Sequence, residues 1–119
     1  MADTTSAIER LPPGTRWPSG DGLDAALLAI DAAELSRRLG FALDSGDEEG
    51  LGPWQGAGLR LSSGIHIGLI EHGFAPTRGF VLQVDSGDDP SAAIDETLAL
   101  LGLTRDALLW LSPLMTSRD

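Results

Sequence analysis

The sequence predicts an α+β fold in which an antiparallel β-meander of three to four strands packs against one or two helices. Between residues 58 and 85, apolar and polar residues alternate with a period of two, in runs separated by Gly- and Pro-containing turns. The segments on either side carry apolar residues at helical spacing. With 119 residues, of which 42% are hydrophobic, the chain is long enough for one core and one domain.

The first 22 residues are rich in Thr, Ser, Pro and Gly, which break regular elements. We predict that residues 1–22 form a flexible arm and that Trp17 pins this arm to the domain by burying its ring. The folded domain is expected to span residues 23–114, and residues 115–119 are expected to fray.

Residues 23–40 allow two interpretations. Their apolar spacing fits one helix, whereas Asp31 followed by Glu34 resembles a capping box that starts a new helix at residues 32–39 after a short strand at 26–30. Gly40 ends the helix in either case. The next segment, residues 44–56, is acidic and rich in Gly, and it predicts a loop that carries Trp54.

The meander itself is the clearest pattern in the chain. Residues 59–62 and 65–70 form a hairpin around the Ser63-Gly64 turn, and residues 80–85 follow as a third strand after a second turn. One face of these strands is apolar and needs a cover. A helix beginning near Pro90, capped by Asp89 or Ser91, supplies it through a stripe made of Ile94, Leu98 and Leu101.

The pattern near the end of the chain allows two interpretations. Gly102 is placed to end the last helix, and residues 107–111 form a short apolar run that includes Trp110. We interpret this run as a final strand with Trp110 in the core, and a second short helix capped by Thr104 is the alternative.

The charge is the best indication of function. The chain has 18 acidic residues against 8 basic ones, all of them Arg, and a net charge of −10. Such a field repels phosphate backbones and anionic lipids, so it disfavours nucleic acid and membrane partners and favours a basic protein. Solubility alone is the alternative explanation. The absence of Lys, Asn and Tyr suggests a GC-rich bacterial gene.

Most of the acidic residues that stand out fall into two expected loops, at residues 44–49 and 85–89. Trp54 lies next to the first of them, and a large ring flanked by carboxylates suits a basic protein surface. We predict that the residues binding a partner are Asp44, Asp47, Glu48, Glu49, Trp54, Asp85, Asp88 and Asp89.

The residues give little reason to expect catalysis or a metal. His66 and His72 are separated along one predicted strand by about 20 Å, too far for a shared metal ion. His72 follows Glu71, but neighbours on a strand point to opposite faces. The acidic clusters lack the spacing of a calcium loop, and the chain has no Cys. We therefore expect a non-enzymatic protein without cofactor or metal, located in a reducing cytoplasm.

The run GLRLSSGIHIGLIEHGFAPTRGFVLQVDS, followed by DDPSAAIDETLALLGLTRDALLWL, resembles small bacterial immunity proteins encoded beside secreted or contact-delivered toxins. The likeness covers about the last two thirds of the chain, and its motifs are structural. It implies an acidic inhibitor that neutralises a cognate toxin by filling the basic active-site cleft of a nuclease or other toxin. We expect the free protein to be a monomer or weak dimer. A small acidic secretion chaperone is the alternative, and it would need an exposed apolar groove or a dimer helix.

Overall fold

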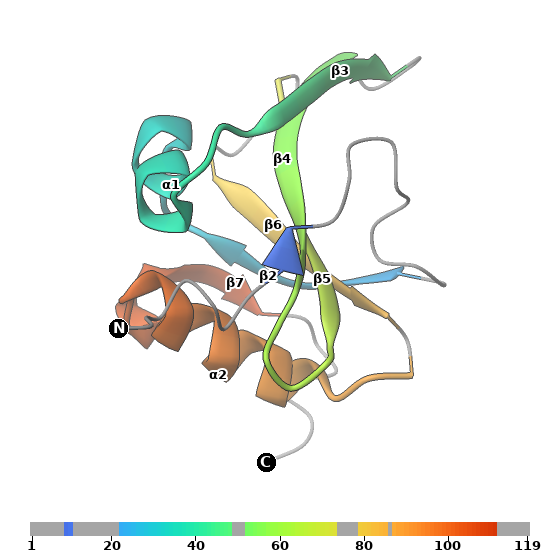
Figure 1. Cartoon of the computed structure of the whole chain (residues 1–119), viewed down its shortest axis with the longest axis vertical. Coiled ribbons are helices and arrows are strands. Elements are labelled where there is room, and N and C mark those ends of the chain that lie inside the picture. Colours follow the sequence, from blue (N-terminus) through green and yellow to red (C-terminus); the bar gives the residue numbers. More distant parts are fainter. Residues whose placement is uncertain (1–8, 11–21, 49–51, 74–78, 86, 112–119) are drawn as a thin grey trace.

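The computed structural model describes residues 9–10, 22–48, 52–73, 79–85 and 87–111. The predicted α+β class is confirmed, but the sheet is larger than the three to four strands expected. Within the described residues it has seven strands, and two α-helices accompany it (Figure 1). The elements are β1 Glu9–Arg10, β2 Gly22–Leu28, α1 Ala32–Leu39, β3 Asp44–Glu48, β4 Gly52–Arg60, β5 His66–His72, β6 Phe80–Asp85, α2 Pro90–Leu101, the 3-10 turn Arg105–Ala107 and β7 Leu108–Leu111.

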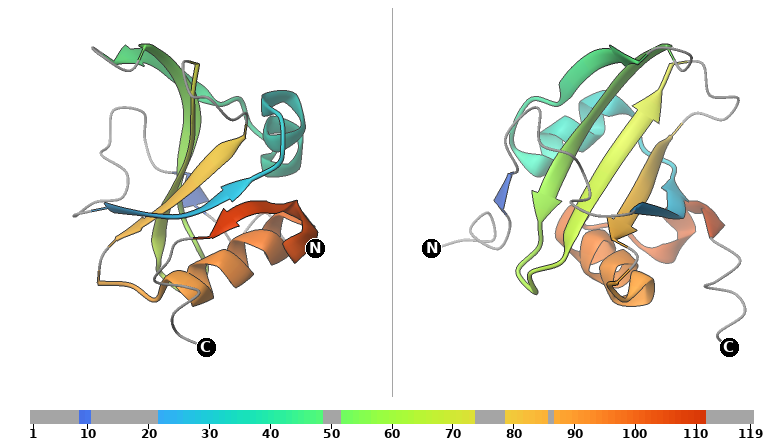
Figure 2. Two further views of the ribbon diagram at one scale, coloured as in Figure 1. Left: turned by 180° about the vertical axis from the view of Figure 1, so that it is seen from behind. Right: turned by 90° about the vertical axis from the view of Figure 1, so that its right-hand side faces the viewer.

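The predicted meander forms the centre of the sheet. The strand order is β1-β4-β5-β6-β2-β7, every pair is antiparallel, and β3 lies beside β4 on the same edge as β1. Both helices lie on one face of this sheet (Figure 2). The core between helices and sheet is apolar, and its largest fully buried side chains include Phe80, Leu28, Leu35, Leu59, Ile67, Leu69, Leu82 and Ile94. None of the helices in the described ranges is long and apolar enough to cross a membrane.

The segment before the meander is split between a strand and a helix, as the capping pattern indicated. The Asp31 carboxylate accepts a hydrogen bond from the Glu34 backbone N–H at 2.8 Å, which starts α1. Gly40 ends it with a φ of 88°, in the left-handed region that favours Gly. The single-helix interpretation is wrong, because β2 bonds to β6 and β7 on its two sides.

The loop expected at residues 44–56 is also wrong for the part of this segment that the structure describes, since residues 44–48 form β3 and residues 52–56 form the first half of β4. Its Gly and Asp residues have low intrinsic strand propensity. The pairing of β3 with β4, and of β4 with β5, supplies the hydrogen bonds that override this preference. The Gly residues that looked like loop residues allow strands to pack closely: a Cβ on Gly56 would lie 3.0 Å from the Ile70 Cα.

At the end of the domain the structure contains both alternatives in succession. Thr104 caps the 3-10 turn by accepting a hydrogen bond from the Asp106 N–H at 3.3 Å, and β7 follows as an edge strand paired with β2. The Trp110 side chain lies outside the described residues, as do Trp17 and the predicted tail at 115–119. Within the predicted arm, Glu9–Arg10 forms β1 and pairs with β4.

Candidate binding site

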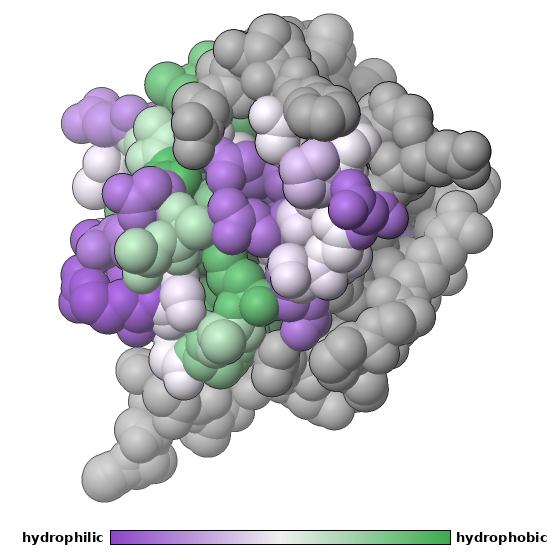
Figure 3. Space-filling view, turned by 90° about the horizontal axis from the view of Figure 1, so that it is seen from above, coloured by the Kyte–Doolittle hydropathy of each residue, from purple (hydrophilic) through white to green (hydrophobic). Residues whose placement is uncertain are grey.

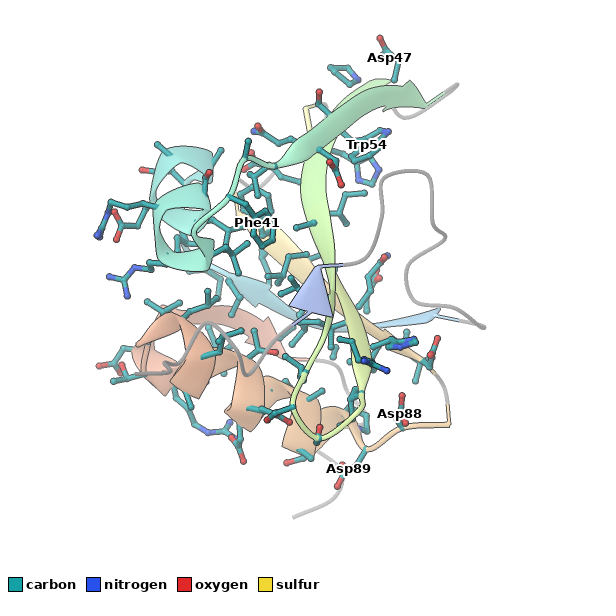
Figure 4. The ribbon with its side chains drawn as sticks, viewed as in Figure 1. Phe41, Asp47, Trp54, Asp88 and Asp89 are labelled. Atoms are coloured by element: carbon teal, nitrogen blue, oxygen red, sulfur yellow. The ribbon has the colours of Figure 1, made fainter. Side chains whose placement is uncertain are left out.

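The predicted partner-binding residues occupy two opposite ends of the molecule. β3 pairs with the beginning of β4, from Gly52 to Gly56. Asp85 ends β6 immediately after Val84, which pairs with Ile67 near the far end of β5. Figure 4 shows Asp47 and Trp54 at one end and Asp88 and Asp89 at the other. These residues therefore form two separate surfaces instead of one.

The residues Asp85, Asp88 and Asp89, which we call the helix-start cluster, help to shape the chain around the start of α2. The Asp89 carboxylate caps α2 by accepting a hydrogen bond from the Ser91 N–H at 3.0 Å, and the Asp88 N–H donates to the Asp85 carbonyl at 3.0 Å. Asp85 is the last residue of β6, so the predicted third strand at 80–85 is confirmed and Asp85 lies at the boundary between this strand and the acidic segment that follows. By register it shares an end and a face of the sheet with Arg60 and His66. This cluster thus has a local structural role.

The second group of acidic residues stands on an edge strand. β3 has the sequence DSGDE, and within the described part of the chain it pairs with β4 alone. Asp47 is exposed and Asp44 is half-buried. Glu48 ends the strand, while its side chain and all of Glu49 lie outside the described residues. The strand consequently places negative charge along one border of the sheet, where the sequence predicted a loop.

Trp54 lies against this strand. It pairs with Gly46 of β3 on one side and with His72 of β5 on the other, so the three residues form a row on one face. The half-buried ring covers Gly46, because a Cβ placed there would lie 2.9 Å from the indole Nε1. The structure therefore brings Trp54 together with the β3 acidic residues, as predicted. We refer to β3 and Trp54 together as the acidic edge.

One hollow adjoins the acidic edge, and a second lies beside it. The first has a volume of about 320 Å³ and is lined by residues that include Ser45, Trp54 and His72. The second, of about 390 Å³, reaches the start of α1 at Asp31 and Ala32. Gln55 and Glu71 line both. The view down onto this end shows hydrophilic and hydrophobic residues side by side on the described surface (Figure 3).

Glu71 is the residue at this end whose role the sequence did not predict. Its side chain is only 7% exposed, and its carboxylate accepts hydrogen bonds from the Gly79 N–H at 2.9 Å and from the Gln55 Nε2 at 3.1 Å. These bonds offset the cost of burying a polar group. The alternation of the β5 strand could have predicted this burial, because residue 71 shares a strand face with the buried residues Ile67 and Leu69.

The arginines of α1 and of the 3-10 turn after α2 are held by acidic partners away from β3. Hydrogen bonds from Arg37 and then Arg38 lower the pKa of Glu34, and the same contact raises the pKa of Arg37. Arg105 pairs with Asp95 of α2 at 2.8 Å. These cations compensate carboxylates of the helices, whereas β3 contains no basic residue.

Comparisons of the chain with protein families, with curated proteins and with solved structures found no match. Among the described residues, no group of three or more His, Asp or Glu side chains is arranged to hold a metal ion. The geometry of the acidic edge is therefore the basis on which a function is proposed.

Proposed function

We propose that this protein is an immunity protein that binds and neutralises a cationic bacterial toxin through its acidic edge. The observation that carries the proposal is the position of Trp54, a half-buried ring beside an edge strand in which three of five residues are acidic. Tryptophan is enriched among the residues that dominate binding energy at protein interfaces. Negative charge along the strand beside such an anchor favours a basic partner.

The overall charge supports the same partner. At −10 the protein attracts a cationic molecule over a distance set by the ionic strength, which is about 8 Å in physiological salt. Such steering raises the rate of association, and the acidic edge would then fix the orientation.

The alternative of a secretion chaperone has less support. It requires an apolar groove or helix face for its client, whereas α2 turns its apolar side to its own sheet. The buried residues of α2 are Ala93, Ile94, Thr97, Leu98 and Leu101.

The proposal is tested with the product of the adjacent reading frame, purified in an inactive form and titrated calorimetrically. Replacing Asp47 by Asn together with Glu48 by Gln should weaken binding by about tenfold, since exposed charges contribute up to about 1 kcal/mol each. The matched control replaces Asp88 and Asp106 by Asn and removes the same charge elsewhere. Equal losses for both pairs would contradict a role for the acidic edge, and a neighbour that is neither bound nor toxic would contradict the function.

A further inference from the structure

The register of β3 determines which of its peptide groups face away from the sheet. The Gly73 N–H donates to the Pro53 carbonyl at 2.7 Å, so this carbonyl points toward β5 and away from β3. Asp47 and Pro53, which lie opposite each other, are therefore a non-hydrogen-bonded pair. Alternation along an antiparallel ladder then makes Gly46 and Trp54 the hydrogen-bonded pair.

The same alternation makes Ser45 and Gln55 a second non-hydrogen-bonded pair. The backbone N–H and C=O groups of Ser45 and Asp47 consequently point outward from the sheet. Both residues are exposed, and within the described ranges β3 has no neighbour on that side. Outward groups on alternate residues are what an added strand requires for pairing.

The chemistry of this border restricts what can pair with it. A second copy of the chain would bring another net charge of −10 and another acidic strand to the same place, and like charges opposite each other destabilise a strand pair. An extended segment that carries Arg or Lys has the complementary charge. The carboxylates thus disfavour self-association at this edge and favour a basic strand.

We propose that β3 accepts an extended basic segment of its partner as an additional antiparallel strand, bonded to the backbone of Ser45 and Asp47. This inference rests on the proposed function and specifies its binding mode. Every strand pair within this sheet is antiparallel, so the added strand continues the existing pattern.

The pleat of the sheet also predicts which residue types alternate along the added basic segment. Ser45 and Asp47 share a face with Gln55, whereas Gly46 lies on the opposite face under the Trp54 ring. Basic residues of the segment should stand opposite Ser45 and Asp47. An apolar residue between them should reach the Trp54 ring, so the expected pattern is basic, apolar, basic.

A synthetic decapeptide of alternating Arg and Val, blocked at both ends, is the probe. We expect it to slow hydrogen exchange of the Ser45 and Asp47 amides at least tenfold while leaving Gly46 unchanged, because the Gly46 amide is already bonded to β4. N-methylation of the Arg residues, which form the bonded pairs with β3, should abolish binding. N-methylation of the Val residues should not.

A pair of protein variants tests the same bond from the other side. Asp47→Ala and Asp47→Pro lose the same charge, but only the Pro variant loses the outward N–H, and Pro is tolerated on an edge strand. We expect Asp47→Pro to bind the decapeptide at least tenfold more weakly than Asp47→Ala. Thermal unfolding checks that both variants fold. If Asp47→Pro does not fold, binding of the methylated peptides to the unmodified protein still tests strand addition.

The outcomes separate the binding mode from the function. Salt-sensitive binding that is equal for both methylated peptides and for both variants would overturn strand addition while leaving the acidic edge as the binding surface. If the double variant Asp47→Asn with Glu48→Gln binds the product of the adjacent reading frame as tightly as the unmodified protein, the acidic edge is not the binding surface of the proposed function.

Discussion

The acidic edge and the helix-start cluster carry the same kind of charge but differ in what surrounds them. In the helix-start cluster, Asp89 caps α2, and the peptide groups of Asp85 and Asp88 bond to each other. Nearby, Glu96 of α2 holds the hairpin turn by accepting hydrogen bonds from Ser62 and Ser63. On the acidic edge, Asp47 is exposed on a strand that pairs on one side in the described structure.

A run of carboxylates therefore does not by itself indicate a binding surface. A carboxylate that caps a helix or anchors a turn stabilises the fold, and its replacement should appear in the free energy of unfolding. An exposed carboxylate on an edge strand contributes little to stability and remains able to meet a partner. The two ends should therefore respond in opposite ways to the same substitution.

The largest expected effect comes from a Gly that supports the acidic edge. Gly56→Ala would place a Cβ inside the van der Waals distance of the Leu69 carbonyl oxygen and 3.0 Å from the Ile70 Cα, both backbone atoms. We expect a loss of about 3 kcal/mol in the free energy of unfolding, measured in urea. Gly87→Ala, beside the helix-start cluster, is the control, because a Cβ there meets nothing within 4 Å. Similar losses for the two variants would contradict this close packing.

Glu96 makes the free energy of unfolding depend on pH through its contacts at the α2 end. Burial alone would raise its pKa, but hydrogen bonds from Ser63 and Ser62 lower it below the ordinary value of 4.5. A lowered folded pKa means that this stabilisation is present above pH 4.5 and is lost as the pH falls through the folded pKa. Glu96→Gln should cost about 1.5 kcal/mol at pH 7.

Urea unfolding of the unmodified protein and of Glu96→Gln at pH 7 and pH 3 measures this effect. The difference between the two proteins should shrink at pH 3, where the carboxyl group is increasingly protonated. A difference that stays constant between the two pH values would show that the ionised carboxylate is not what holds the turn.

The smallest effect compares one Asp from each end directly. Asp89→Ala removes the α2 cap and should cost about 1 kcal/mol in the free energy of unfolding. Asp47→Ala should change it by less than about 0.5 kcal/mol, as is usual for an exposed substitution. Partner affinity should show the reverse order. A destabilisation by Asp47→Ala as large as that by Asp89→Ala would remove the distinction between the two ends.

Local patterns predicted much of the scaffold. The period of two located the hairpin and the strand of β6, and Asp89, Pro90 and Gly102 marked the limits of α2. They failed at residues 44–48 and 52–56, where Gly and Asp suggested a loop. There β3 pairs with β4, and β4 pairs with β5, so both segments are strands. At the candidate site, the sequence predicted that Trp54 lies beside the first acidic cluster, but it did not predict the burial of Glu71.

Inspection of the residues alone was enough to predict the α+β class, the central meander, the caps of the helices and the excess of negative charge. These depend on residue type and on spacing along the chain, which are local properties. The three-dimensional arrangement was needed to show that the acidic residues separate to opposite ends, and that Ser45 and Asp47 direct their peptide groups outward. Both features depend on which strands pair and in which register. Pairing joins residues that are far apart in the sequence, and the local spacing of residue types does not reveal such partners.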